Sequence, residues 1–127
     1  MSKVLMTGGM GFIGSHCIEK WKSVGWDVCV VDNMSTNAIP LDHPILENVE
    51  VIQKDILNID YKTLPEVDLV LHLASPVGPV GVLKHSGNMA RIILDDIYWA
   101  INTAKYNNCP LVFISTSEIY GHRDEKS

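Results

Sequence analysis

Glycines near the amino terminus have the spacing of a phosphate-binding loop. Gly8, Gly11 and Gly14 form the pattern G-x-x-G-x-x-G, with Gly9 as a fourth glycine, between a short apolar stretch and a helical pattern. The first turn of a helix has unpaired backbone N–H groups and the positive end of the helix dipole, so an anion is stabilised there. Glycines let the backbone turn sharply out of a strand and approach such a ligand closely. We therefore predict a site for a dinucleotide pyrophosphate, the alternative being a glycine-rich turn without a ligand.

An acidic residue follows this loop at the distance that a dinucleotide site requires. Asp32 ends the second apolar run, 18 residues beyond Gly14. A carboxylate at the end of a second strand can accept hydrogen bonds from both hydroxyls of the adenosine ribose, and it repels a 2′-phosphate. Residues 33–38 contain no arginine that could bind such a phosphate. The pattern predicts NAD rather than NADP as the cofactor, the alternative being that Asp32 is an ordinary acid in a surface loop.

The elements that must position these residues alternate between strands and helices. Short apolar runs predict strands at residues 3–6, 26–31, 49–53, 68–73 and 111–115. Apolar residues at helical spacing predict one helix over residues 12–24, whose apolar face comprises Ile13, Cys17, Trp21 and Val24. They predict a second helix from residue 84 or 87 to 106, whose apolar face comprises Ala90, Ile93, Leu94, Ile97, Ile101 and Ala104. We expect Gly25 to end the first helix. Residues 34–48 should be irregular, and residues 56–64 at most a turn of helix.

This alternation implies parallel strands joined by right-handed crossovers. With the glycine loop after the first strand, it predicts the α/β class and a doubly wound Rossmann sheet of order 3-2-1-4-5. We expect helices on both faces, the ligand at the carboxyl ends of the strands, and a sheet cut off after the fifth strand.

Composition bounds the class of protein. The chain has 127 residues, 46% of them hydrophobic and 20% charged, which predicts a single globular domain over residues 1–127. The net charge of −5 argues against a nucleic-acid partner. No apolar run approaches the ~18 residues of a membrane span, and the first residues enter a strand without a signal-peptide pattern, so we expect no membrane association. Three scattered cysteines indicate reduced thiols in the cytoplasm, and five scattered histidines indicate no metal site.

Five motifs occur in the order of a known family. They are residues 7–16 (TGGMGFIGSH), 32–33 (DN), 54–56 (KDI), 72–76 (HLASP) and 115–121 (STSEIYG). The chain thereby resembles the extended short-chain dehydrogenase/reductase family, the NAD-dependent epimerases and dehydratases of nucleotide sugars. The last two motifs look most like the UDP-glucuronate decarboxylase branch. The resemblance covers almost the whole chain.

The resemblance implies NAD as the cofactor and assigns roles to particular residues. The implied cofactor-binding residues are Gly8, Gly11, Phe12, Ile13, Gly14, Asp32, Asn33, Asp55, Ile56, Leu73, Ala74 and Ser75. Among them, Asp55 would lie beside the adenine, and residues 73–75 would line the path to the nicotinamide ribose. Thr116 matches the active-site hydroxyl that binds the sugar hydroxyl losing hydride, and Glu118 matches a carboxylate near the sugar ring. The alternatives are a Thr116 hydroxyl that satisfies backbone groups and a Glu118 that is solvated in a loop.

The chain also departs from the family pattern. The family's base is a tyrosine in Y-x-x-x-K, and none of the four tyrosines here precedes a lysine at that spacing. We expect that motif and the sugar-binding region beyond residue 127. Asp96 and Trp99 replace a family Asn and Gly; Trp99 and its neighbour Tyr98 could form a subunit contact or pack in the core. We expect a homo-oligomer or an aggregation-prone monomer, with residues 90–104 as a contact.

Together these patterns predict the NAD-binding domain of a nucleotide-sugar epimerase, dehydratase or decarboxylase, whose full-length form takes a nucleotide-sugar substrate. Three explanations of the missing base remain open. The sequence could be a fragment of a longer enzyme, a chain that combines with another supplying the tyrosine and lysine, or a stand-alone module that binds NAD or a partner without catalysis.

Overall fold

The computed structural model describes residues 2–34, 37–74 and 89–114. In chain order, the elements are β1 (Lys3–Thr7), α1 (Phe12–Ser23), β2 (Asp27–Asp32), the 3-10 turn η1 (Pro44–Leu46), β3 (Glu50–Gln53), the 3-10 turns η2 (Ile56–Asn58) and η3 (Tyr61–Thr63), β4 (Leu69–His72), α3 (Met89–Asn107) and β5 (Leu111–Phe113). The expected strands are all present, with ends that differ by one or two residues. Within the described ranges, no helix has the length and apolar character needed to cross a bilayer.

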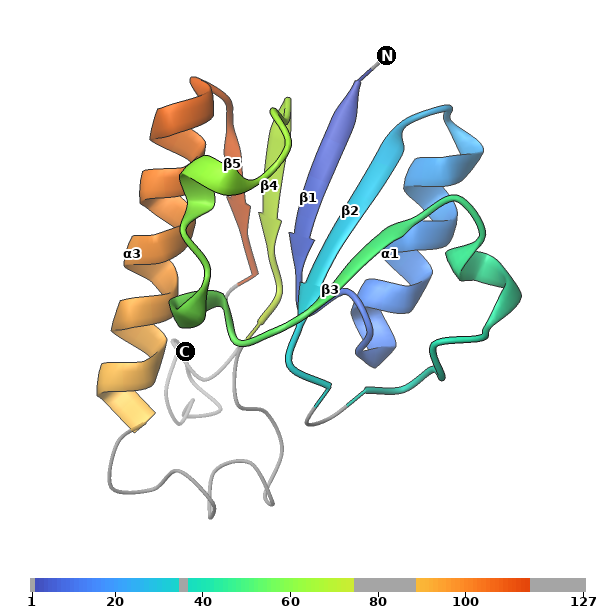
Figure 1. Cartoon of the computed structure of the whole chain (residues 1–127), viewed down its shortest axis with the longest axis horizontal. Helices are drawn as coiled ribbons and strands as arrows, with labels where there is room; N and C mark the ends of the chain where they lie inside the picture. The colour runs from blue at the N-terminus through green and yellow to red at the C-terminus, as the bar shows by residue number, and fades with distance from the viewer. Residues whose placement is uncertain (1, 35–36, 75–88, 115–127) are drawn as a thin grey trace, which may run out of the picture.

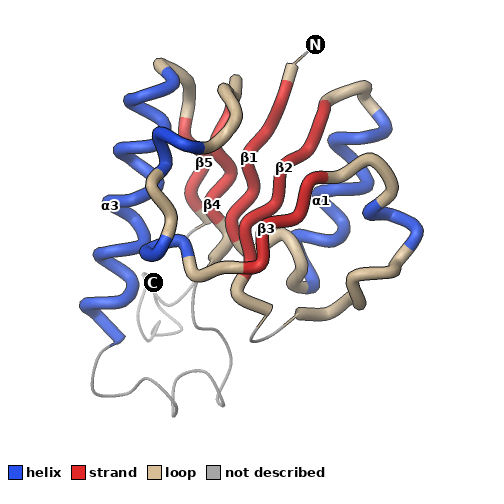
Figure 2. The backbone as a smooth tube through the Cα atoms, viewed as in Figure 1, coloured by secondary structure: helices blue, strands red, loops and turns tan. Residues whose placement is uncertain are grey.

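The strands form one parallel sheet in the order β3-β2-β1-β4-β5, as the sequence predicts (Figure 1). β1 lies at the centre, with Thr7 opposite Val31 of β2 on one side and opposite His72 of β4 on the other. All strands therefore end at the same edge, where the chain leaves β1 for the glycine loop and where α1 begins (Figure 2).

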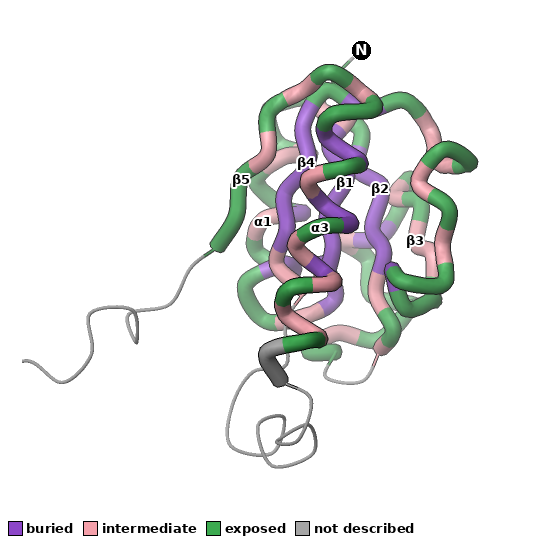
Figure 3. Tube along the Cα trace, turned by 90° about the vertical axis from the view of Figure 1, so that its left-hand side faces the viewer, coloured by how far each residue is buried: buried purple, intermediate pink, exposed green. Residues whose placement is uncertain are grey.

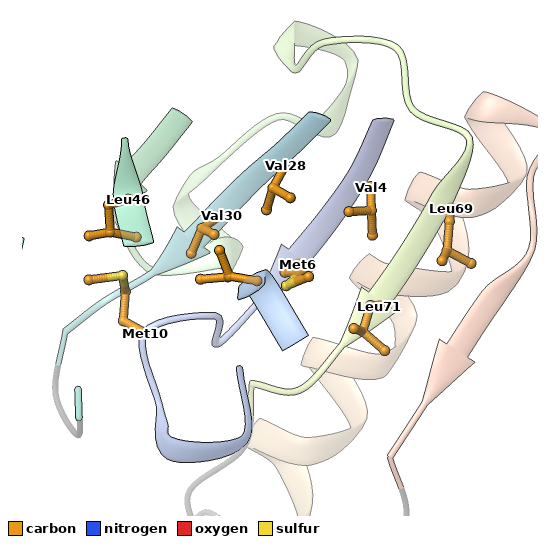
Figure 4. Packing of buried hydrophobic residues seen from close by; sticks show 9 residues of the cluster. Val4, Met6, Met10, Val28, Val30, Leu46, Leu69 and Leu71 are labelled. Carbon is orange, nitrogen blue, oxygen red and sulfur yellow. The ribbon is translucent and has the colours of Figure 1, made fainter. Parts of the chain in front are cut away.

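The helices of the described residues, α1 and α3, cover opposite faces of the sheet, so the expectation of helices on both faces is confirmed. Successive strand residues point to opposite faces, and the core accordingly divides into two clusters. One cluster contains Met6, Val30 and Leu71 (Figure 4) together with Ile18 of α1. The other contains strand residues adjacent to these, Leu5, Val31 and Val70, together with Trp99 of α3. The central strands β1, β2 and β4 are buried for most of their length (Figure 3).

The buried face of α1 differs from the predicted one. Cys17 and Trp21 pack against the core, but Ile13 and Val24 are 56% and 55% exposed. The face toward the sheet is instead centred on Gly14, Ser15 and Ile18. A Cβ on Gly14 would lie 2.6 Å from the Gly8 carbonyl oxygen, so the close approach at this glycine sets the rotation of the helix.

The buried face of α3 is also rotated from the predicted stripe. Its innermost residues are Asp96, Trp99, Ala100, Thr103 and Ala104. Of the predicted stripe, Ala104 is buried, Ile93, Ile97 and Ile101 are half-buried, Leu94 is exposed, and Ala90 lies outside the described side chains. The Trp99 indole accounts for this rotation, because it enters the core and donates a hydrogen bond of 3.0 Å to the Ile59 carbonyl. Core packing is thus confirmed for Trp99 and is wrong for Tyr98, which is 62% exposed.

The remaining irregular segments behave largely as expected. Gly25 ends α1 with a φ of +87°, a conformation that favours glycine. The segment predicted as irregular contains one 3-10 turn, in which Pro44 occupies the first position, where its missing N–H costs nothing. Residues 56–64 form two short 3-10 turns rather than one turn of helix.

Candidate functional site

The glycine loop is built by close backbone contacts that only glycine permits. Gly8 has a φ of +71°, and its N–H donates to the Val31 carbonyl at 2.8 Å. A Cβ on Gly8 would lie 2.8 Å from the backbone nitrogen of Ala74. A Cβ on Gly14 would lie 2.6 Å from both the Gly8 oxygen and the Gly9 Cα. Gly8 and Gly14 thus let β1, α1 and the chain after β4 converge at one point.

Gly11 differs from these two glycines, because packing within the chain does not require it. Among the described residues, a Cβ on Gly11 would contact only the Gly8 oxygen, at an ordinary 3.4 Å. Gly11 is the N-cap of α1 and provides no side chain to its N–H groups, and the first turn has no acidic residue. The side chains of Phe12 and Ile13 are exposed. The first turn of α1 therefore leaves backbone N–H groups available to an external anion. A side chain at Gly11 would narrow the space beside these N–H groups.

Asp32 lies at the same edge of the sheet and ties the glycine loop to the turn after β2. Its Oδ2 accepts a hydrogen bond from the Met10 N–H at 3.0 Å, and its Oδ1 accepts one from the Met34 N–H at 2.7 Å. Each carboxylate oxygen has two lone pairs, so both retain acceptor capacity. The half-buried carboxylate is held in one orientation, and the exposed Asn33 follows it.

A buried network beneath the loop escaped the sequence analysis, which assigned no role to Thr7 and only a general one to His72. The Thr7 hydroxyl lies 2.6 Å from His72 Nδ1 and accepts hydrogen bonds from the N–H groups of Leu73 and Ala74, each at 3.1 Å. Burial lowers the pKa of His72 to about 4. The neutral ring therefore accepts the Thr7 proton at Nδ1, and the network fixes the chain after β4 against the glycine loop. The signal available in the sequence was that both residues end strands that are neighbours in the predicted order.

Other predicted residues are placed around this edge. Ile56 is buried in the core, and the exposed Asp55 caps η2, its Oδ1 accepting from the Leu57 N–H at 3.0 Å. Leu73 and Ala74 are half-buried and adjoin Gly8. Ser75, Thr116 and Glu118 lie outside the described residues.

Asp96 approaches the same edge from α3. It is 8% exposed, and burial, followed by the charges of Asp55 and Asp95, raises the pKa of its carboxyl group to about 7. In the sequence, Asp96 is distinguished only by its departure from the family pattern. Asp55, whose charge acts on Asp96, is 41 residues away in the sequence, so no local pattern relates the two acids.

Comparison with known proteins agrees with this arrangement. The NAD dependent epimerase/dehydratase family matches residues 4–127. UDP-glucuronic acid decarboxylase 1 of Danio rerio is 36% identical over 121 residues, which cover 94% of this chain and 28% of that protein. The similarity to the decarboxylase branch that the motifs indicate is thereby confirmed. The chain thus spans less than a third of the length of this relative.

Solved structures agree in the same way. UDP-N-acetylglucosamine 4-epimerase from Methanobrevibacter ruminantium M1, in complex with UDP-N-acetylmuramic acid, superposes with a TM-score of 0.83 at 30% identity, covering 98% of this chain and 41% of that one. MoeE5 in complex with UDP-glucose and NAD has a TM-score of 0.78 at 25% identity, covering 97% of this chain and 39% of that one. From its matched residues, its motifs and its sheet, the chain belongs to the NAD-dependent epimerase/dehydratase family.

Proposed function

We propose that this chain binds NAD across the carboxyl edge of its sheet. The observation that carries the proposal is the pairing of an uncapped helix start at Gly11 with a fixed carboxylate at Asp32. A helix N-terminus favours the pyrophosphate, and an oriented carboxylate favours the two ribose hydroxyls. Both groups lie at one edge, because β1 and β2 are parallel neighbours.

We assign the parts of NAD to the residues as follows. The pyrophosphate would bind the backbone of the glycine loop and the N–H groups of Phe12 and Ile13. The adenosine ribose would lie at Asp32 and Asn33, the adenine at Asp55 and Ile56, and the nicotinamide ribose at Leu73, Ala74 and Ser75. The support for this path is the convergence of the three segments, in which Gly8 touches Ala74 and Asp32 bonds to Met10.

In the whole protein, we propose that the substrate is a nucleotide sugar, of the UDP class that the relatives' names specify. Bound NAD supplies the hydride acceptor for a sugar carbon. We assign Thr116 to the sugar hydroxyl and Glu118 to the sugar ring. A phenol of ordinary pKa, about 10, is a poor base near neutral pH. Since residues 1–127 contain no Y-x-x-x-K motif, we expect these residues alone to bind NAD without converting a sugar.

That missing motif also supports a second candidate function, a module that binds NAD or a partner without catalysis. Turnover by the 127-residue chain mixed with the rest of a longer reading frame would favour the enzyme. Failure of any such mixture to act, with NAD binding intact, would favour the module.

The test of NAD binding is a calorimetric titration of the 127-residue chain, wild type against Gly11→Val. We expect one NAD per chain for the wild type and no binding by the variant. A branched side chain would narrow the space beside the N–H groups of the first turn, whereas its Cβ would meet the Gly8 oxygen at 3.4 Å. Circular dichroism melting checks that the variant folds. Equal NAD affinity in a folded Gly11→Val chain would overturn the assignment.

We further propose that the chain acts in the cytoplasm and self-associates. All three cysteines are unpaired, and burial raises the pKa of Cys29 to about 12, so its thiol stays protonated. Leu94 and Tyr98 are exposed one turn apart on α3, and Phe113 is exposed on β5, an edge strand of the described sheet. Exposed apolar side chains and an open edge favour association.

A further inference from the structure

Asp96 is a nearly buried acid at the cofactor edge that the proposed binding scheme does not use. Its side chain lies on the inner face of α3, which packs against η2, directly after Asp55. Among the described residues, none donates a hydrogen bond to its carboxyl group, and no cation pairs with it. A buried carboxylate without partners is costly, so such a group tends to hold a proton.

Among the described residues, the charges that act on Asp96 are those of two acids. Asp55 lies directly before η2, and Asp95 precedes Asp96 on α3. Asp95 is half-buried and forms a weak ion pair with Arg91, with Nε and Oδ2 3.8 Å apart. An aromatic base bound over Asp55 would exclude water from the region around Asp55 and Asp96. It would thereby strengthen the repulsion between their two carboxylates.

Other titratable groups lie on the elements packed against α3. Among the described residues, Lys62 on η3 is exposed, and no ion pair joins it to Asp96. His72 on β4 is neutral above its pKa of about 4 and bonds to Thr7. Tyr61 on η3 makes edge contacts with the rings of Trp99 and Tyr106. The pKa of Asp96 is about 7, so the charge of this carboxyl group changes around neutral pH.

We propose that the chain takes up a proton at Asp96 when NAD binds, so that NAD affinity falls as the pH rises through neutrality. The proposal rests on the proposed function, because it places the adenine at Asp55 and Ile56. An adenine at this position removes the remaining water from Asp96. The loss of water costs little for the neutral acid, but it destabilises the charged carboxylate. Asp96 is a positioning residue in this scheme. Its protonation state changes the affinity for NAD, because the adenine excludes water from its carboxyl group.

The size of the effect follows from the titration of the free chain. Burial, with Asp55 and Asp95, raises the pKa of Asp96 to about 7, so the acid is about one-tenth ionised at pH 6 and about nine-tenths ionised at pH 8. If only the protonated form binds, NAD affinity is about tenfold lower at pH 8 than at pH 6. Binding at pH 8 should then take up about 0.9 proton, and binding at pH 6 about 0.1.

The experiment is calorimetry of NAD binding at pH 6, 7 and 8, repeated in buffers of different ionisation enthalpy to count protons. The 127-residue chain is compared with Asp96→Asn, which removes the charge and keeps the shape. Asp27→Asn is the matched control, because Asp27 is an exposed acid at the start of β2, the opposite edge of the sheet. We expect the tenfold fall for the wild type and Asp27→Asn, and affinity independent of pH for Asp96→Asn. ADP-ribose should show the same proton uptake as NAD, and nicotinamide mononucleotide, which lacks adenine, should show none.

The outcomes separate this proposal from the proposed function. Binding of NAD with equal affinity at pH 6 and pH 8, or without proton uptake, overturns the role of Asp96 alone. A tenfold fall that persists in Asp96→Asn also overturns it. No NAD binding at any pH overturns both proposals. If Asp96→Asn does not fold, the wild-type proton count with ADP-ribose and with the mononucleotide still decides.

Discussion

Replacing Thr7 with valine tests whether the buried hydroxyl holds the chain after β4 in place. Valine keeps the shape of threonine but removes the oxygen that serves three partners. The Leu73 N–H keeps the Thr7 carbonyl as an acceptor at 3.0 Å. The Ala74 N–H and His72 Nδ1 lose the partner that the structure gives them.

The expected cost follows from those two groups. A buried polar group left without a partner costs about 1–3 kcal/mol, so the loss of both partners in Thr7→Val should lower the free energy of unfolding by about 2–6 kcal/mol. That is a large share of the roughly 5–15 kcal/mol that stabilises an ordinary domain. Thr7→Ser is the matched control, because it restores the hydroxyl and loses only a methyl group, at a cost of about 1 kcal/mol.

Urea unfolding at pH 7, followed by circular dichroism, measures both variants against the wild type. We expect the order wild type, then Thr7→Ser, then Thr7→Val. The reasoning is refuted if Thr7→Val is within about 0.5 kcal/mol of the wild type, or if the serine and valine variants are equally unstable.

Three further outcomes follow from the structure. The lowered pKa of His72 means that stability is fully present above pH 6.5 and falls on acidification toward pH 4, by up to about 3 kcal/mol; urea unfolding from pH 7 to pH 4 should show this fall for the wild type and a flatter profile for His72→Gln. Gly14→Ala should lower the melting temperature and abolish NAD binding because of its 2.6 Å contacts. Gly11→Ala should change stability by less than about 1 kcal/mol, and equal melting of the two variants would contradict this contrast. Sedimentation should show association that Tyr98→Glu weakens, whereas a monomeric wild type at all concentrations would count against self-association.

The sheet order was predictable because each strand is a short apolar run and the glycine loop identifies the first crossover. The helix faces were not predicted, because small or polar residues occupy positions that apolar periodicity assigns to solvent. Gly14 faces the sheet because it has no side chain, and Thr103 is buried while its hydroxyl bonds to the Trp99 carbonyl. Such residues reveal their burial only through contacts with other elements.

Part of the candidate site was likewise predictable from the sequence, and part was not. The glycines and Asp32 were found because their spacing within one strand–helix–strand unit is local in sequence. The Thr7–His72 contact spans 65 residues and exists only through the register of β1 with β4. The proximity of Asp55 to Asp96 likewise depends on how α3 packs on η2. These relations belong to the fold and not to any single stretch of sequence.

The preference of the wild-type chain for NAD over NADP tests the central claim most directly, since it needs no variant. The Asp32 carboxylate, held by the N–H groups of Met10 and Met34, should accept from the ribose hydroxyls and repel a 2′-phosphate. One charge-assisted contact is worth about 1.5–3 kcal/mol, which corresponds to roughly a tenfold to hundredfold difference in affinity. Calorimetry at pH 7 should therefore give an NADP dissociation constant at least about tenfold above that of NAD. Equal affinities, or tighter binding of NADP, would contradict the account.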